Sequence, residues 1–315
     1  MSFYVARRAL SIALVLVLIS LIVFVAIHVL PGSAATLILG EYATPQSLRA
    51  LEREMGLDRP FAVQYVAWIG GVVTGDWGYS LAMKQPVTAI IGLRLRNSAL
   101  LAGFALLAVV LVAIPLGTLA ALRRGRALDF AILTASYVGI SVPEFVTGMV
   151  LILVLAGPSL HLFPTGDYAP LAAGLRTWLS HLVLPALTLT LVLIAHVLRQ
   201  TRSGLVEVLQ SAYVRTARLK GATERRVVVR HALRNGLLPA VTVIALDLGY
   251  LMGGIVVVEE VFAYPGMGRL ILYAIQNRDV PLLQVSILIV AATYAFANFA
   301  ADMAYAWLDP RIRFQ

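Results

Sequence analysis

Cysteine is absent from the 315-residue chain, and charged residues make up only 13% of it. The lack of cysteine excludes disulfide frameworks, cysteine-based zinc sites and cysteine nucleophiles. The low charge argues against disorder, which is typical of polar, highly charged chains. Soluble domains have about 25% charged and 45–50% apolar residues, whereas 60% of this chain is hydrophobic. A soluble core could not bury so much apolar surface, so the composition predicts an integral membrane protein.

The common motifs of catalysis are also missing. The sequence contains no GxxxxGK[ST] phosphate loop, no HExxH metal motif and no GxSxG nucleophile elbow. Its five histidines are scattered without metal-ligand spacing, and we interpret His196 as a packing residue near the end of a helix. No internal repeat supports a secondary transporter built from inverted repeats. We therefore expect no catalytic, metal or cofactor site in this chain.

A membrane-spanning helix needs about 20 predominantly apolar residues. Pro143 interrupts one of the candidate runs. The first run could instead be a cleaved signal peptide, but it is longer than the roughly 7–15-residue apolar core of such signals. We therefore predict an all-α membrane protein with six transmembrane helices. The predicted spans are about 9–30, 97–122, 130–156, 182–198, 237–258 and 282–307.

The basic residues orient these spans. With the N-terminus inside, 16 of the 25 Lys and Arg residues fall in the predicted inner segments. Because inner loops of membrane proteins are rich in Lys and Arg, both termini are predicted to be cytoplasmic. This topology accounts for the net charge of +9, so no nucleic-acid partner is needed.

Residues 31–96 are predicted to form an extracytoplasmic insertion. Within it, Thr44–Met55 has the apolar spacing of a helix, with Thr44 as a cap and Pro45 in the first turn. An aromatic stretch follows at Phe61–Trp68. The insertion could be a lid of helices lying on the bilayer or a docking surface for an external partner, and both interpretations stay open.

Residues 199–236 form a predicted inner segment with a helix, a glycine and a second helix. Ser203 is expected to cap the first helix and Thr223 the second. Gly221 stands where a residue with positive φ would end the first helix. The sequence therefore predicts a helical hairpin on the inner side of the membrane.

Each predicted helix of this hairpin has distinct faces. The expected apolar stripes are Leu205, Val208, Leu209 and Ala212 on the first helix, and Val229, Leu233 and Leu237 on the second. The expected basic face is formed by Arg226, Arg230 and Arg234. Such a hairpin could rest on anionic lipid headgroups or fit as a knob into a groove of a soluble protein.

Polar residues inside the predicted spans need partners, because burying them in hydrocarbon is costly. Glu144 follows Pro143 in the third span, and Asp247 lies in the fifth. The sixth span has one polar face, made up of Tyr294, Asn298, Asp302 and Tyr305. These residues could line a pathway or join helices by hydrogen bonds, and we favour the second role.

The inner segment YVRTARLKGATERRVVVRHALRNGLLP resembles the cytoplasmic coupling loop of binding-protein-dependent ABC importer permeases of the dipeptide, oligopeptide and nickel subgroup. Supporting runs follow in order along the chain. They are Gly56–Pro60, Gly75–Gly78, Glu260–Gly268, Arg278–Pro281 and Leu308–Arg311. The broader family has Glu-Ala-Ala before the loop glycine, whereas Arg215 and Thr216 stand in the first two places here.

The resemblance implies the six-helix architecture of a type I ABC importer permease in the bacterial inner membrane. It also implies a second homologous permease, two ATPase subunits that bind ATP and Mg²⁺, an extracytoplasmic solute-binding protein and a surrounding lipid bilayer. Peptide is the expected solute, while nickel complexes, glutathione and sugar conjugates stay open. The implied ATPase-coupling residues are Tyr213, Ala217, Arg218, Lys220, Gly221, Ala222, Glu224 and Arg225.

Two other classes of protein compete with this interpretation. An ion-coupled secondary transporter or channel would use the carboxylates of Glu144, Asp247 or Asp302. A membrane enzyme has the least support because no catalytic constellation is visible. The hairpin at 199–236 favours the importer, because a self-sufficient carrier does not need a docking knob for an ATPase.

Overall fold

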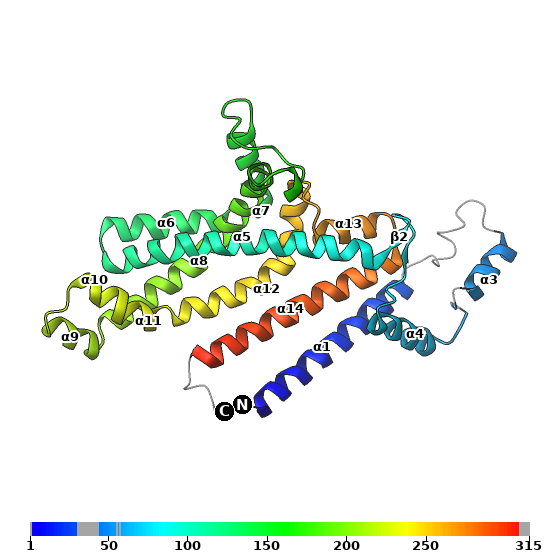
Figure 1. The fold of residues 1–315 in the computed structure, drawn as a ribbon, viewed down its shortest axis with the longest axis horizontal. Helices are drawn as coiled ribbons and strands as arrows, with labels where there is room; N and C mark the ends of the chain where they lie inside the picture. Colours follow the sequence, from blue (N-terminus) through cyan, green and yellow to red (C-terminus); the bar gives the residue numbers. More distant parts are fainter. Residues whose placement is uncertain (1, 30–43, 55, 57, 309–315) are drawn as a thin grey trace. The chain divides into compact units, whose positions relative to one another are not determined.

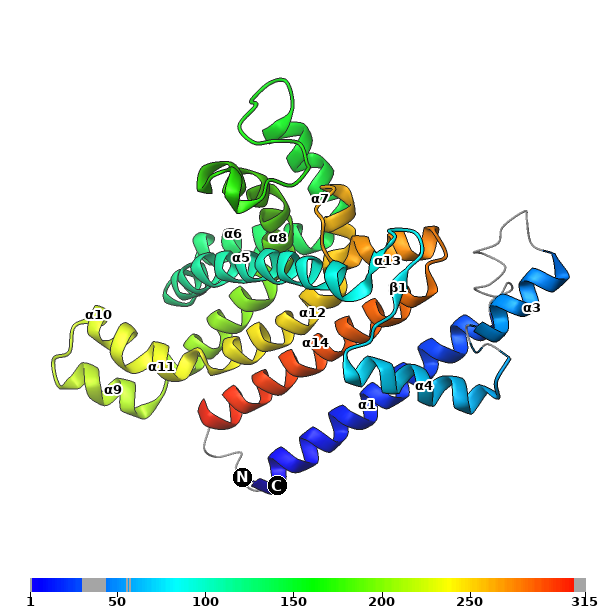
Figure 2. The same ribbon diagram turned by 45° about the vertical axis from the view of Figure 1, so that its right-hand side comes forward.

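The computed structural model of the chain describes residues 2–29, 44–54, 56 and 58–308. The start of the predicted insertion, Met55, Leu57 and nearly all of the Leu308–Arg311 run lie outside the described residues. Long helices dominate the described part (Figures 1 and 2).

The chain divides into two compact units, which we describe separately. The first unit holds residues 1–97 and 265–295, and the second holds residues 98–264 and 296–315. The elements that lie in the first unit, or begin there, are α1 (Ser2–Val29), α3 (Pro45–Glu54), α4 (Phe61–Thr74), β1 (Tyr79–Ser80), β2 (Gln85–Pro86), α5 (Val87–Leu122), α13 (Met267–Gln276) and α14 (Val280–Leu308). The elements of the second unit are α6 (Ala127–Ser141), α7 (Glu144–Leu151), η2 (Ile152–Ala156), η3 (Leu171–Ala173), α8 (Leu175–Leu209), α9 (Ala212–Leu219), α10 (Glu224–Arg226), η4 (Val227–Ala232), α11 (Leu233–Gly236) and α12 (Leu238–Val261).

Four helices are long and apolar enough to cross a membrane, and up to six spans result if each of two bent helix pairs counts as one. The four are Val5–Ala26, Val87–Leu122, Leu175–Leu209 and Val280–Ala300. The bent pairs are Ala127–Ser141 with Glu144–Ala156, at 103°, and Glu224–Gly236 with Leu238–Leu251, at 50°. The described residues therefore contain four to six candidate spans.

The predicted third span, 130–156, is not one straight helix. Val142 has an extended backbone (φ −94°, ψ 129°) and separates α6 from α7. The reason is Pro143, because the ring of a proline disfavours helical geometry in the residue before it. Pro115 and Pro185 instead lie inside the continuous helices α5 and α8. Neighbouring groups in a membrane protein can compensate for the hydrogen bond that a proline removes.

In the first unit, α4 packs against α1 through aromatic rings. The ring centroids of Phe24 and Phe61 lie 5.0 Å apart, and those of Phe24 and Trp68 lie 5.6 Å apart. The hydroxyl groups of Ser20 and Tyr65 form a hydrogen bond of 2.8 Å. A separate apolar core joins α5, α13 and α14, with Val87, Ile91, Leu270, Leu282 and Val285 among its buried residues.

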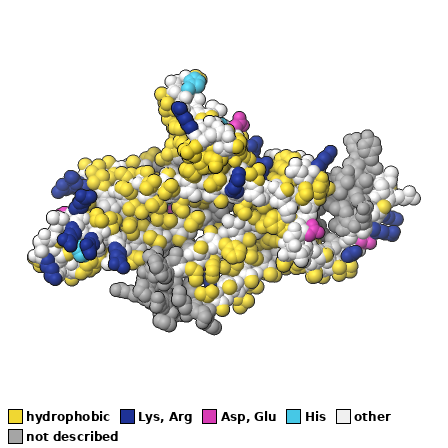
Figure 3. Space-filling model, viewed as in Figure 1, with side chains coloured by type: hydrophobic (Ala, Val, Ile, Leu, Met, Phe, Trp, Pro, Cys, Tyr) yellow, Lys and Arg dark blue, Asp and Glu magenta, His cyan; other side chains and the backbone are white. Residues whose placement is uncertain are grey.

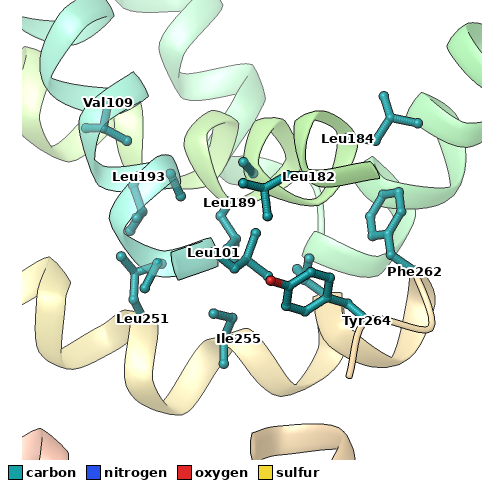
Figure 4. Packing of buried hydrophobic residues seen from close by; sticks show 14 of the residues in the cluster. Leu101, Val109, Leu182, Leu184, Leu189, Leu193, Leu251, Ile255, Phe262 and Tyr264 are labelled. Atoms are coloured by element: carbon teal, nitrogen blue, oxygen red, sulfur yellow. The ribbon is translucent and has the colours of Figure 1, made fainter. Parts of the chain in front are cut away.

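The core of the second unit surrounds α8, which contacts α6, α7, α11 and α12. Its buried side chains include Leu101, Leu189, Leu193, Leu251 and Tyr264 (Figure 4). Two glycines allow neighbouring helices to approach α8 closely. A Cβ added at Gly117 would lie 2.8 Å from the carbonyl oxygen of Leu198, and one added at Gly139 would lie 2.8 Å from the carbonyl oxygen of Leu191. Helix α8 is therefore the central element of this unit.

Candidate functional site

The predicted inner segment contains a helical hairpin, residues 212–236, which we call the coupling hairpin. One arm is α9, and the other consists of α10, η4 and α11. Ser203 does not cap a helix as predicted; it lies inside α8 and its hydroxyl donates to the Gln200 carbonyl oxygen. Helix α8 runs on to Leu209 through Gly204, where the backbone packs closely against Gly236, and the side chain of Leu205 is buried. Only Gln210 and Ser211 separate α8 from α9.

The turn of the hairpin has the predicted geometry. Gly221 has a φ of +80°. Its N–H donates to the Arg218 carbonyl oxygen, and the N–H of Ala222 donates to that of Ala217. These two bonds form a Schellman motif, which satisfies the last carbonyl groups of a helix and needs a left-handed residue after it. The role of Gly221 as the residue that ends the first arm is confirmed.

Thr223 stands before α10 with an extended backbone, but its side chain makes no capping hydrogen bond, contrary to prediction. Instead, a two-point ion pair crosses the turn. Arg218 donates from Nε to Oε1 of Glu224 at 2.7 Å and from Nη2 to Oε2 at 3.2 Å. Because both side chains are exposed, this pair adds little stability, but it holds the ends of the two arms together.

The predicted apolar stripe of the second arm is wrong at Val229, whereas Leu233 and Leu237 are half-buried. Val229 is 60% exposed, whereas Val227, Val228 and Ala232 are buried. Residues 227–232 form a π-helical turn, whose i→i+5 hydrogen bonds shift the register from the 3.6-residue period used for the prediction. The predicted basic face is exposed at all three positions, Arg226, Arg230 and Arg234. Figure 3 shows Lys and Arg side chains gathered over this part of the chain, at the left of the view.

The end of the hairpin presents an apolar side chain that sequence reasoning missed. Leu219 is 82% exposed, next to the exposed Lys220 and Gly221. The signal was a leucine at the end of a short helix whose buried residue, Val214, lies on another face. An apolar knob flanked by cations suits an apolar groove with an acidic rim.

The structure places seven of the predicted coupling residues around the hairpin turn and the eighth, Tyr213, between the two arms. Exposed around the turn are Arg218, Lys220, Gly221, Glu224 and Arg225, and half-buried are Ala217 and Ala222. Tyr213 joins the two arms: its hydroxyl donates to the His231 carbonyl oxygen at 3.3 Å and accepts from Asn235 Nδ2 at 3.0 Å. Its hydroxyl therefore supports the hairpin, whereas the turn residues lie at the exposed end of the hairpin.

Two predicted intramembrane acids, Glu144 and Asp247, have partners on neighbouring helices of the second unit. The Tyr250 hydroxyl donates to Oε1 of Glu144 at 2.5 Å. Asp247, three residues before Tyr250 and so on the same face of α12, has Oδ1 at 3.5 Å from Nδ1 of His196. His196 therefore joins α8 to α12, which agrees with its interpretation as a packing residue, but it lies inside α8 rather than near the end of a helix. Asp247 Oδ2 is buried without a hydrogen-bond partner among the described residues.

The other two predicted polar residues lie on α14. Asn298 and Asp302 are four residues apart and half-buried, which places them on one helix face. The side chain of Tyr305 lies outside the described residues. In the part of the chain that the structure describes, no three His, Asp or Glu side chains are grouped to hold a metal ion.

An ion pair between a buried carboxylate and a half-buried arginine, which sequence reasoning missed, joins α6 to α8. Arg202 donates from Nε to Oδ1 and from Nη2 to Oδ2 of Asp129, both at 2.6 Å. Oδ2 also accepts from the N–H of Gly125 at 2.9 Å. Asp129 is 1% exposed. The signal was an acid in the first turn of a helix that follows the arginine-rich turn 123–126, but the identity of its partner depends on tertiary structure.

A second acid, which is buried, organises the segment around β1 in the first unit. Asp279 Oδ2 accepts from the Ser80 hydroxyl at 2.6 Å and from the Ala82 N–H at 3.1 Å. Its Oδ1 accepts from the N–H of Leu282 at 3.3 Å, in the first turn of α14. Asp279 therefore joins the turn after β1 to the start of α14.

Known proteins resemble this chain over its whole length. Residues 113–314 match the family described as "Binding-protein-dependent transport system inner membrane component", and residues 1–101 match the N-terminal region of such membrane components. A probable peptide ABC transporter permease of Sinorhizobium fredii, y4tP, is 37% identical over 314 residues, covering 100% of both chains. The glutathione transport system permease GsiC of Escherichia coli K12 is 37% identical over 312 residues, covering 99% of both. The chain therefore belongs to the family of inner-membrane permease components of binding-protein-dependent ABC importers.

Proposed function

We propose that this chain forms half of the translocation pathway of an ATP-driven importer and that its coupling hairpin docks on an ATPase subunit. The observation that carries the proposal is the exposed end of the hairpin. An 82%-exposed leucine, Leu219, stands among Arg218, Lys220 and Arg225 on a turn that is closed by backbone hydrogen bonds. A surface that only rested on lipid headgroups would not need such a rigid, two-armed turn.

The complete transporter would contain a second homologous permease, two ATPase subunits and an extracytoplasmic solute-binding protein. ATP and Mg²⁺ would bind to the ATPase subunits, and this chain would hold no cofactor of its own. We infer six spans with both termini in the cytoplasm, counting each bent helix pair as one span. The distribution of Lys and Arg along the chain supports this orientation.

Peptide-like molecules are the proposed solute class. The relatives named above are a probable peptide permease and a glutathione permease, and glutathione is itself a small peptide. We propose that the outer insertion 31–96, organised in its described part by α4 and Asp279, meets the solute-binding protein. Glu144, Asp247, Asn298 and Asp302 serve in this proposal mainly as contacts between helices.

Reconstitution in lipid vesicles tests the proposal. The permease would be assembled with its partner permease, ATPases and binding protein, and uptake of a labelled peptide would be measured with and without internal ATP. Uptake should require ATP and should stop when the partner ATPases cannot hydrolyse it. Uptake that continues in the ATPase-deficient assembly would instead favour an ion-coupled carrier.

A further inference from the structure

The ion pair of Asp129 and Arg202 lies where movement of the coupling hairpin would enter the membrane helices. Helix α8 is continuous from Leu175 to Leu209, and α9 begins after only two intervening residues. Arg202 is therefore seven residues, or about two helical turns, from the end of α8. A displacement of the hairpin reaches Arg202 through a single helix.

The second arm of the hairpin is also held tightly against α8. A Cβ added at Gly204 would clash with the Gly236 carbonyl oxygen, and one added at Gly236 would lie 2.8 Å from Cδ1 of Leu205. The backbones of α8 and α11 thus approach without intervening side chains at this point. Interiors packed in this way transmit displacement with little compression.

The geometry of the pair is suited to transmitting this movement to α6. Two parallel hydrogen bonds of 2.6 Å between Arg202 and Asp129 fix orientation as well as distance. The third bond, from the N–H of Gly125, adds the turn between α5 and α6 to the same carboxylate. Gly125 has a φ of +74°, which glycine adopts without the strain that other residues incur.

Stability alone does not explain this ion pair. Burying the Asp129 carboxylate costs hydration, and apolar residues of similar volume often stabilise a fold as well as such a pair or better. A role in orientation accounts for the directional geometry. Helix α6 begins at this pair and ends at the Pro143 break, directly before Glu144, which accepts from Tyr250. A shift of α6 would therefore reach the contact between α7 and α12.

We propose that Asp129 and Arg202 are positioning residues that make the α5–α6 turn and α6 move together with the coupling hairpin. The pair converts a movement of α8, imposed by the ATPase, into a movement of α6 and the bend that follows it. This inference rests on the proposed coupling function. It assigns the transmission step to two side chains outside the hairpin.

Variants of the complete reconstituted transporter test the inference. Uptake and ATP hydrolysis are measured together, and their ratio gives the ATP consumed per solute imported. Asp129→Asn and Arg202→Gln should raise this ratio about 2- to 30-fold while assembly and ATP hydrolysis persist. Arg199→Gln is the matched control, because Arg199 lies on the same helix and is exposed; its ratio should stay at the parent value.

A covalent tether distinguishes a positioning role of the Asp129–Arg202 pair from a role in folding. The chain has no cysteine, so Asp129→Cys with Arg202→Cys, in an assembly whose other subunits lack cysteine, can be joined by a short bifunctional thiol reagent. The untethered double variant should be poorly coupled, and the tether should restore uptake toward the parent value. An unchanged ratio in Asp129→Asn, a tether that fails to restore uptake, or a tether that blocks it would overturn the inference. Parent uptake that needs no ATP would instead overturn the proposed function.

Discussion

Tyr250 on α12 donates a hydrogen bond to Glu144, the first residue of α7, across 106 residues of sequence. The bond lies directly after the break that Pro143 makes between α6 and α7. A carboxylate at the start of a helix is favoured by the helix dipole, and here it also receives a hydroxyl from a neighbouring helix. The bond therefore connects α7, in the bent third predicted span, to α12, which follows the coupling hairpin.

Removing this bond should weaken the second unit. Tyr250→Phe deletes the hydroxyl and leaves the half-buried Glu144 carboxylate with one donor fewer, so we expect a loss of about 1 kcal/mol in the free energy of unfolding. Thermal unfolding of the purified permease in detergent would measure it. Tyr294→Phe, at an exposed tyrosine of α14, is the control. Equal effects of the two variants would contradict the structural role of the Tyr250 hydroxyl.

Gly221→Val should uncouple transport and leave the chain in the membrane. Valine at a φ of +80° is strained by about 1–2 kcal/mol, which would distort the hairpin turn. No atom lies within 4 Å of an added Cβ, so the effect is conformational rather than steric. Uptake and ATP hydrolysis of the reconstituted transporter provide the measurement.

Asparagine is the control at this position, because it tolerates left-handed backbone better than other side chains. Gly221→Asn should retain most of the uptake. If valine and asparagine gave the same normal uptake, the left-handed turn would not matter for coupling.

Leu219→Asp should weaken association with the ATPase subunits by about 1–2 kcal/mol. The side chain is 82% exposed, so the stability of the isolated permease should change by less than about 0.5 kcal/mol. Co-purification of permease and ATPase at increasing salt would measure the association. Leu219→Met preserves an apolar side chain of similar size and should behave like the parent. Undiminished ATPase binding by the Asp variant would exclude Leu219 from the interface.

Asp279→Ala should destabilise the first unit by about 1.5–3 kcal/mol, because hydrogen bonds to a charged group contribute in this range. The change leaves the Ser80 hydroxyl and the N–H groups of Ala82 and Leu282 without their acceptor. Faster proteolysis near β1 and β2 and a lower unfolding temperature are the expected results. Asp76→Ala, at an exposed acid that accepts from the Gly78 N–H, should change neither. Matching results for the two variants would argue against the role of Asp279.

Some features could be predicted because they depend on nearby residues. Long apolar runs must form helices in a membrane, where every backbone polar group needs an internal partner. Gly221 ends α9 with positive φ because glycine lacks the Cβ that makes this backbone costly. The basic face at Arg226, Arg230 and Arg234 remains exposed because charged side chains are rarely buried without a partner.

Tertiary structure decided the rest, since the relevant partners are distant in sequence. Pro143 breaks a helix while Pro115 and Pro185 do not, although each of the three prolines follows an apolar residue within an apolar run. The π-helical turn at 227–232 and the continuation of α8 beyond residue 199 changed which side chains are buried.

The partners of the acidic residues were also only partly predictable from the sequence. Composition and hydropathy identify Glu144 and Asp247 as polar groups in apolar surroundings, and the cost of burial implies that each has a partner. Only the packing of α7, α8 and α12 determines that these partners are Tyr250 and His196. Apolar length and charge distribution along the chain thus indicate a helical membrane protein, whereas the contacts that join its helices arise from three-dimensional packing, because they depend on side chains that no local pattern relates.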